Sequence, residues 1–302
     1  MSATTTGVGN HLRTNRPVPG IYRDVPESVY HGVWDIASST RLRKLMESSP
    51  RHMRHSIQHS KPTPEMKIGS LVHAMVLTPA LVDRSYTQAP DVDRRSKEGK
   101  AAWAEFVASA GERTVITARE WATAVRAAEA VRASVAATTL LEACEERELS
   151  VVQEIEKCLV KVRVDGYGLA VGAIDVKTTS DLATREQFER AIGNMGYGFQ
   201  ASLYRMVCRE AGIRCNDFCF IVVETVKLKA SDEDDQPSKH TEARVFRLRD
   251  DVMDAYEPEV RDALVSYAVC ERSGRWDGYE DTIEDVALPP WIAARMGLRG
   301  GA

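Results

Sequence analysis

The hydrophobic pattern of the chain changes near residue 149. Before that point, apolar residues recur at helical spacing, most clearly at Ile68, Leu71, Val72, Met75 and Val76, which follow i, i+3, i+4, i+7 and i+8. Further helices are predicted over 40–48, after Ser38-Ser39 and before Pro50, in the second part of 91–110, and over 117–135. The first half of the chain is therefore predicted to be largely helical.

After residue 149, short β-branched runs with alternating polarity are typical of strands. They lie at 149–156, 158–165, 170–179, 217–226 and 244–249, with a glycine-containing turn over 165–172. Helices are predicted over 184–193, 197–212 and 250–273, and a polar, acidic loop over 229–243. The pattern indicates an α/β fold in which a mixed sheet is flanked by helices, with a disordered tail over 1–17 and a single domain over 18–302.

Composition narrows the class of protein. The 302 residues carry a formal net charge of −4, so the chain is not a generally basic nucleic-acid binder, and any basic surface must be local. There is no apolar run long enough for a membrane helix and no secretory signal, which predicts a cytoplasmic protein. The spacing of Cys208, Cys215 and Cys219 is poor for an iron–sulfur cluster, so none is expected.

One predicted strand, "AIDVKTT", carries an acid and a base on the same face. Asp175 and Lys177 are two residues apart and project side by side, opposite Ile174 and Val176. Asp165 ends the preceding strand, and a hairpin would bring the two carboxylates together. Such a pair suits Mg²⁺, and an adjacent lysine could orient or deprotonate a water for phosphodiester hydrolysis. The alternative is an exposed sheet face with a solvated ion pair.

Three further side chains are candidates, and each has a structural alternative. His73 lies beside an apolar helix face, where a histidine is more often part of the core or its rim than a ligand. Gln200 and Tyr204 are four residues apart on a predicted helix and share a face. A packed tyrosine with a polar neighbour explains that pair equally well.

As an ordered set, these motifs resemble the RecE-type exonucleases, the exonuclease VIII family, within the PD-(D/E)xK superfamily that also includes RecB-like and lambda-type exonucleases. The resemblance spans residues 20–293 and is carried by Gly69-x-x-x-His73, Glu148-Leu-Ser150, Arg163-Val-Asp165, Asp175-Val-Lys177-Thr178-Thr179 and Gly196-Tyr197-Gly198-Phe199-Gln200-Ala201-x-x-Tyr204. One departure is Val164, where many relatives are expected to have proline.

By matching position, the resemblance implies a PD-(D/E)xK core and a role for each motif residue. His73, Asp165, Asp175 and the Val176 carbonyl would bind Mg²⁺, with Mn²⁺ as a possible substitute. Lys177 would be the catalytic lysine, and Gln200 and Tyr204 would orient Lys177 or the DNA backbone. Glu148 could support a second metal or a water, or could simply end a strand. The densest basic loop, interpreted as a DNA contact or a solvated helix entry, contains Arg94, Arg95, Lys97 and Lys100.

The resulting hypothesis is a magnesium-dependent exodeoxyribonuclease that acts on linear double-stranded DNA. Relatives work 5′ to 3′ and leave a 3′ single strand for an annealing protein of the RecT type, in phage or prophage recombination, and they form closed rings. A homo-oligomeric ring, trimer or tetramer, is therefore expected here. Two alternatives stay open: a structure-specific or restriction-like endonuclease on the same core, and a non-catalytic DNA-end binder that recruits the annealing protein.

Overall fold

The computed structural model describes residues 14–59, 61–225 and 241–296, and is organised around one large sheet. The six strands of this sheet follow the order β1-β4-β5-β6-β7-β8; β6 and β7 are parallel, and the other neighbours are antiparallel. Their bounds are β1 Gly20–Tyr22, β4 Glu146–Ile155, β5 Cys158–Gly168, β6 Gly172–Thr179, β7 Phe218–Glu224 and β8 Ala243–Leu248. The sheet is mixed, as predicted, and mainly antiparallel.

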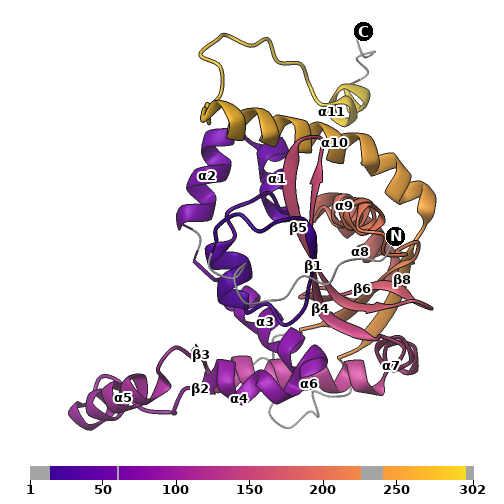
Figure 1. Cartoon of the computed structure of the whole chain (residues 1–302). Coiled ribbons are helices and arrows are strands. Elements are labelled where there is room, and N and C mark those ends of the chain that lie inside the picture. Colours follow the sequence, from indigo (N-terminus) through magenta and orange to yellow (C-terminus); the bar gives the residue numbers. More distant parts are fainter. Residues whose placement is uncertain (1–13, 60, 226–240, 297–302) are drawn as a thin grey trace.

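Helices cover both faces of this sheet (Figure 1). One face packs on α1 (Ser39–Glu47), α2 (Pro50–His59), α8 (Arg185–Asn194), α9 (Tyr197–Glu210) and α10 (Asp250–Ser273). The other packs on α3 (Pro64–Leu77), α6 (Ala118–Ala133) and α7 (Val135–Glu142). The remaining elements are η2 (Ser28–Val33), η3 (Pro79–Leu81), α4 (Val82–Ser85), β2 (Tyr86–Gln88), α5 (Lys97–Ala110), β3 (Thr114–Ile116) and α11 (Pro290–Arg295).

One helix was missed and one predicted turn was too long, each for a local reason. The helix predicted over 117–135 is α6, which ends at Ala133; α7, which was not predicted, begins after it because the Ser134 side chain accepts a hydrogen bond from the backbone N–H of Ala137. The turn predicted over 165–172 is shorter, since β5 continues to Gly168 and pairs there with Gly172. Gly172 has φ +72°, and a Cβ at that position would lie 2.2 Å from the Asp217 carbonyl oxygen, so only glycine fits.

Several short elements were not predicted. Helix α2 begins at Pro50, where the pattern indicated only the end of the helix before it; proline is favoured in the first turn of a helix because its missing N–H is not needed there. Strands β1, β2 and β3 have three residues each, too few for an alternating pattern to be recognised. Most of the predicted loop over 229–243, and residues 1–13 of the predicted tail, lie outside the described residues.

Residues 14–17 of that tail are described, and they contact the body of the protein. The backbone N–H of Asp35 donates to the Asn15 carbonyl at 2.9 Å, and Arg16 pairs with Glu271 at 2.6 Å. In the part of the chain that the structure describes, no helix is both long and apolar enough to cross a membrane.

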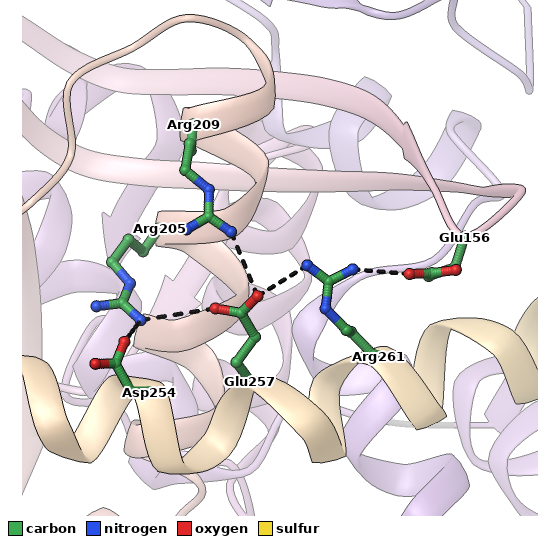
Figure 2. A network of polar contacts seen from close by, with 6 residues as sticks. All are labelled: Glu156, Arg205, Arg209, Asp254, Glu257 and Arg261. Carbon is green, nitrogen blue, oxygen red and sulfur yellow. Dashed lines mark hydrogen bonds and ion pairs between the residues drawn. The ribbon is translucent and has the colours of Figure 1, made fainter.

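A network of ion pairs fastens α10 to α9 and to the β4–β5 turn (Figure 2). Glu257 is its centre, with carboxylate oxygens 2.8 Å from Arg261, 3.4 Å from Arg209 and 3.9 Å from Arg205. Arg261 also reaches Glu156 at 2.7 Å. The network lies beside Pro258, which cannot donate a backbone hydrogen bond within α10. The ion-pair network therefore holds α10 in place at the point where the backbone hydrogen bonding of the helix is interrupted.

Replacing Glu257 with glutamine should lower the free energy of unfolding by about 1 kcal/mol. The loss is modest because the carboxylate is partly exposed and solvent screens its ion pairs, although three arginines share it. Urea denaturation measures the change, and Glu259→Gln, at an exposed position on the same helix, is the matched control. Equal stability of the two variants would show that the network contributes nothing measurable.

Candidate active site

Two acidic side chains face each other across β4 and β5. Glu148 lies opposite Asp165, between the register pairs Arg147↔Gly166 and Leu149↔Val164. Glu148 has φ +51°, a left-handed conformation that is uncommon for a residue other than glycine, asparagine or aspartate. Glu148 lies within β4 and not at its end, so its side chain is placed opposite Asp165 by the strand itself.

The pairing of β5 with β6 extends from the turn as far as Gly166↔Ile174 and does not include Asp165. Beyond it, Asp165 Oδ2 accepts a hydrogen bond from the backbone N–H of Val176 at 2.8 Å, so a side chain replaces the missing strand contact. The predicted hairpin thus brings Asp165 beside the residue that follows Asp175.

Helix α3 places His73 against the same carboxylate. Gly69, one turn earlier, lets α3 approach β6, since a Cβ there would lie 3.2 Å from Thr178 Oγ1. His73 Nε2 hydrogen-bonds the Val176 carbonyl, and Nδ1 lies 3.4 Å from Asp165 Oδ2. A carbonyl only accepts, so Nε2 carries the hydrogen, and in the neutral ring the Nδ1 lone pair faces a carboxylate oxygen. That arrangement is favourable only with a proton or a metal ion between the two atoms.

His73, Glu148 and Asp165 form a cluster that fits a metal ion. Each offers one ligand atom, and these atoms all lie within 4.8 Å of one another. Burial, against the opposing influence of His73 and with help from the neighbouring Asp175 and Glu148 carboxylates, raises the pKa of Asp165 to about 7. Burial also raises the pKa of Glu148, against the influence of Arg163 at 3.7 Å. A divalent cation would relieve this accumulation of buried carboxylates.

Asp175 and Lys177 form a buried pair next to that cluster. Lys177 Nζ lies 2.6 Å from Asp175 Oδ2, and Asp175 is only 3% exposed. The solvated ion pair considered from the sequence is therefore excluded, while Ile174 and Val176 pack in the core on the opposite face, as predicted. Burial lowers the pKa of Lys177, but the carboxylates of Asp175 and Asp165 outweigh it and raise the pKa above its ordinary value.

Both carboxylate oxygens of Asp175 have partners. Gln200 Nε2 donates to Oδ1 at 2.6 Å, and Lys177 Nζ lies 2.6 Å from Oδ2. A buried carboxylate is normally satisfied in this way. The structure therefore groups Glu148 most tightly with His73 and Asp165, and leaves Asp175 adjacent to them and paired with Lys177.

Helix α9 supplies the side chains behind this pair. Gln200 contacts Asp175 rather than Lys177. Tyr204, one turn further along α9, is buried. Burial raises the pKa of its hydroxyl well above the usual value, and a hydrogen bond from Gln200 opposes that shift. Sequence reasoning gave no role to Tyr197, whose ring centre lies 5.2 Å from Lys177 Nζ, although its position in the Gly196–Tyr204 motif was a usable signal.

The four basic residues predicted to contact DNA lie elsewhere, on a projection that we call the α5 arm (β2, α5 and β3). Figure 1 shows α5 extending away from the rest of the molecule. The Arg94 guanidinium sits 4.5 Å from the ring centre of Trp103, and Arg95 pairs with Asp93 at 3.1 Å. Lys97 and Lys100 are exposed and, among the described residues, have no ion-pair partner.

Comparison with known families gives one match, which spans most of the chain. The model described as "PDDEXK-like domain of unknown function (DUF3799)" matches residues 38–286. This range contains His73, Glu148, Asp165, Asp175 and Lys177. No curated protein matches the sequence.

Comparison with solved structures supports the fold. A putative exonuclease from Eubacterium rectale aligns with a TM-score of 0.54 and 12% identity, over 86% of this chain and 92% of that one. A phage-related exonuclease from Haemophilus somnus 129PT aligns with a TM-score of 0.34 and 17% identity, over 80% of this chain and 96% of that one. At these identities, the first similarity shows a shared fold, and the second is too distant to carry an argument.

Proposed function

The chain belongs to the family of PDDEXK-like domains of unknown function, and from this premise we propose that it is a metal-dependent deoxyribonuclease. The observation that carries the proposal is the buried Asp175–Lys177 pair, held at 2.6 Å beside the His73, Glu148 and Asp165 cluster. A fold alone does not define an activity. Here the fold brings together acids, a histidine and a lysine, which is the chemistry that phosphodiester hydrolysis requires.

The metal proposed for this site is Mg²⁺, with Mn²⁺ as a substitute. His73, Glu148 and Asp165 would hold it, with an Asp175 carboxylate oxygen and the Val176 carbonyl as further oxygen ligands. When bound, such an ion polarises a phosphoryl oxygen and lowers the pKa of a water. Lys177 would position the attacking water, and Gln200 would hold the Asp175 carboxylate in orientation. Tyr204 would in turn fix Gln200.

The substrate proposed is linear double-stranded DNA, degraded from its ends. The resemblance to RecE-type exonucleases supports 5′ to 3′ polarity, a 3′ single-stranded product passed to a RecT-type annealing protein, and a role in phage or prophage recombination. The structural neighbour from Eubacterium rectale is itself described as a putative exonuclease. These features are consistent with the proposed chemistry but depend on that resemblance.

The α5 arm is proposed to contact the phosphate backbone. Because Arg94 and Arg95 are already engaged by Trp103 and Asp93, Lys97 and Lys100 are the cations available to DNA. Replacing both lysines with alanine should weaken duplex binding and lower the slope of log K against log salt by up to about 2, since each phosphate contact contributes about 0.9. Fluorescence anisotropy at several salt concentrations measures the slope. An unchanged slope would exclude the arm from the DNA interface.

A homo-oligomeric ring, trimer or tetramer, is proposed from the same resemblance. The net charge of −4 supports it, because an acidic exterior with locally concentrated basic residues suits a protein that encloses DNA. Light scattering of the purified protein distinguishes a closed ring from a monomer. A stable monomer that degrades linear duplex processively would exclude the ring.

One experiment distinguishes the proposal from its alternatives. Purified protein is incubated with Mg²⁺ and either an end-labelled linear duplex or a covalently closed circle of the same sequence. An exonuclease degrades the linear duplex and leaves the circle intact. Cutting of the circle would instead identify a structure-specific or restriction-like endonuclease. Binding of linear ends without cleavage would identify a non-catalytic DNA-end binder.

A further inference from the structure

A second cavity lies apart from the His73–Lys177 site, between the N-terminal segment, α1, α2 and the end of α10. Its volume is about 340 Å³, at the lower end of the range for small-molecule sites. None of its lining residues belongs to the candidate active site. They include Arg16, Asp35, Arg41, Arg54, Glu271 and Trp276.

Three arginines from three different segments converge on this cavity, against two carboxylates. Arg16 pairs with Glu271 at 2.6 Å, and Arg41 pairs with Asp35 at 2.6 Å. Arg54 contacts the ring of Trp276, 4.8 Å from its centre, and has no carboxylate partner among the described residues. The lining therefore carries one uncompensated positive charge.

Arg41 has hydrogen-bond donors to spare. Its side chain is only 12% exposed, yet Nη1 alone makes the described bonds, to Asp35 and to the Tyr267 hydroxyl at 3.3 Å. A guanidinium has five N–H donors, and a buried one is normally satisfied. Arg41 lines the cavity, so an oxyanion bound there could accept hydrogen bonds from its guanidinium in the paired geometry that arginine offers to phosphate and carboxylate.

The rest of the wall suits the organic part of a ligand. Met53 is buried, and Ile57 and Trp276 are packed against the same core, so this side of the cavity is apolar. Asn15 and Gln58 add amides that can both donate and accept hydrogen bonds. An inorganic anion would leave these surfaces unused, whereas a nucleoside monophosphate has a phosphate for the arginines and a base with polar edges for the amides.

We propose that this cavity binds a nucleoside monophosphate, with its phosphate between Arg41 and Arg54. The inference goes beyond the proposed nuclease activity and does not depend on it, because no residue of the active site takes part. The ligand could arrive as a free nucleotide or as the phosphorylated end of a strand, and the same phosphate chemistry would recognise both. We commit to the free nucleotide because the cavity has the size of a small-molecule site.

Isothermal titration of the full chain in chelator tests this proposal. Deoxyadenosine monophosphate should bind with one-to-one stoichiometry, and more tightly than deoxyadenosine or inorganic phosphate. Arg54→Gln should weaken binding about tenfold or more, since a charge-assisted contact is lost. Arg54 is exposed, so this variant should fold normally. Arg275→Gln, an exposed arginine paired with Asp277 outside the cavity, should bind like the unmodified chain. Lys177→Ala should also bind normally, which separates this site from the catalytic one.

Several results would overturn the proposal. They are the absence of saturable binding, equal affinity for phosphate and nucleotide, unchanged affinity in Arg54→Gln, or loss of binding in Lys177→Ala. A short 5′-phosphorylated oligonucleotide should bind no more tightly than the monophosphate. If only the oligonucleotide binds, the cavity recognises a strand end, and the assignment to a free nucleotide is wrong.

Discussion

The Lys177→Ala variant should fold, bind Mn²⁺ and cleave linear duplex about 10²–10⁴-fold more slowly than the unmodified protein, the usual contribution of a side chain that positions or activates a water. Lys177 is the only cation paired with Asp175 among the described residues. Its removal leaves that buried carboxylate with the Gln200 hydrogen bond, so some stability is lost as well. Bound metal should restore part of it, because the metal binds only the folded state.

Single-turnover cleavage measures this effect, with circular dichroism and Mn²⁺ titration as checks on folding and metal binding. Lys100→Ala, on the α5 arm, is a matched control for the loss of one positive charge and should retain the chemical step under saturating enzyme. Near-normal cleavage by a folded, metal-loaded Lys177→Ala protein would show that the lysine serves the structure and not the reaction.

The Asp165→Asn variant should lose metal binding and cleavage together, yet be at least as stable as the unmodified protein when both are metal-free at pH 8. Because the pKa of Asp165 is raised to about 7 in the folded state, above its ordinary value of 3.8, the folded protein binds the extra proton. Stability from this group is therefore present at acidic pH and is lost as pH rises from about 4 to about 7. Asparagine removes that cost and can still accept the Val176 N–H.

The same pKa makes metal affinity depend on pH in the unmodified protein. Below about pH 7, Asp165 must release a proton before it can bind a cation, so Mn²⁺ affinity should fall by up to about tenfold per pH unit. Thermal unfolding in chelator and Mn²⁺ titrations at pH 6 and pH 8 measure the two effects. Tight Mn²⁺ binding by Asp165→Asn would remove this residue from the metal site, and a marked loss of metal-free stability would contradict the pKa argument.

Much of the site could be predicted from short-range patterns in the sequence. The i, i+2 spacing of Asp175 and Lys177 fixed their common face, and the β5–β6 hairpin placed Asp165 next to them. Helix α3 has nearly the bounds that its apolar period predicts, and α10 has the predicted bounds, because these segments are long and strongly periodic.

The features that the sequence did not predict depend on long-range contacts. The partner of Asp175 on α9, Gln200, lies 25 residues further along the chain. The left-handed backbone of Glu148 has no sequence signature, since glutamate rarely adopts it. The second cavity joins Arg16, Arg41 and Arg54 to the end of α10, and no local pattern predicts that these segments meet.

The proposed function requires that the His73–Lys177 site hydrolyses phosphodiester bonds with a divalent metal ion. The most direct measurement is incubation of the purified full chain with end-labelled linear duplex, with Mg²⁺ or Mn²⁺ in one reaction and chelator in the other, alongside Lys177→Ala. Mononucleotides or short products are expected with metal, intact duplex with chelator, and nearly intact duplex with the variant. Cleavage that persists in chelator, or that Lys177→Ala performs at the full rate, would contradict the proposed function.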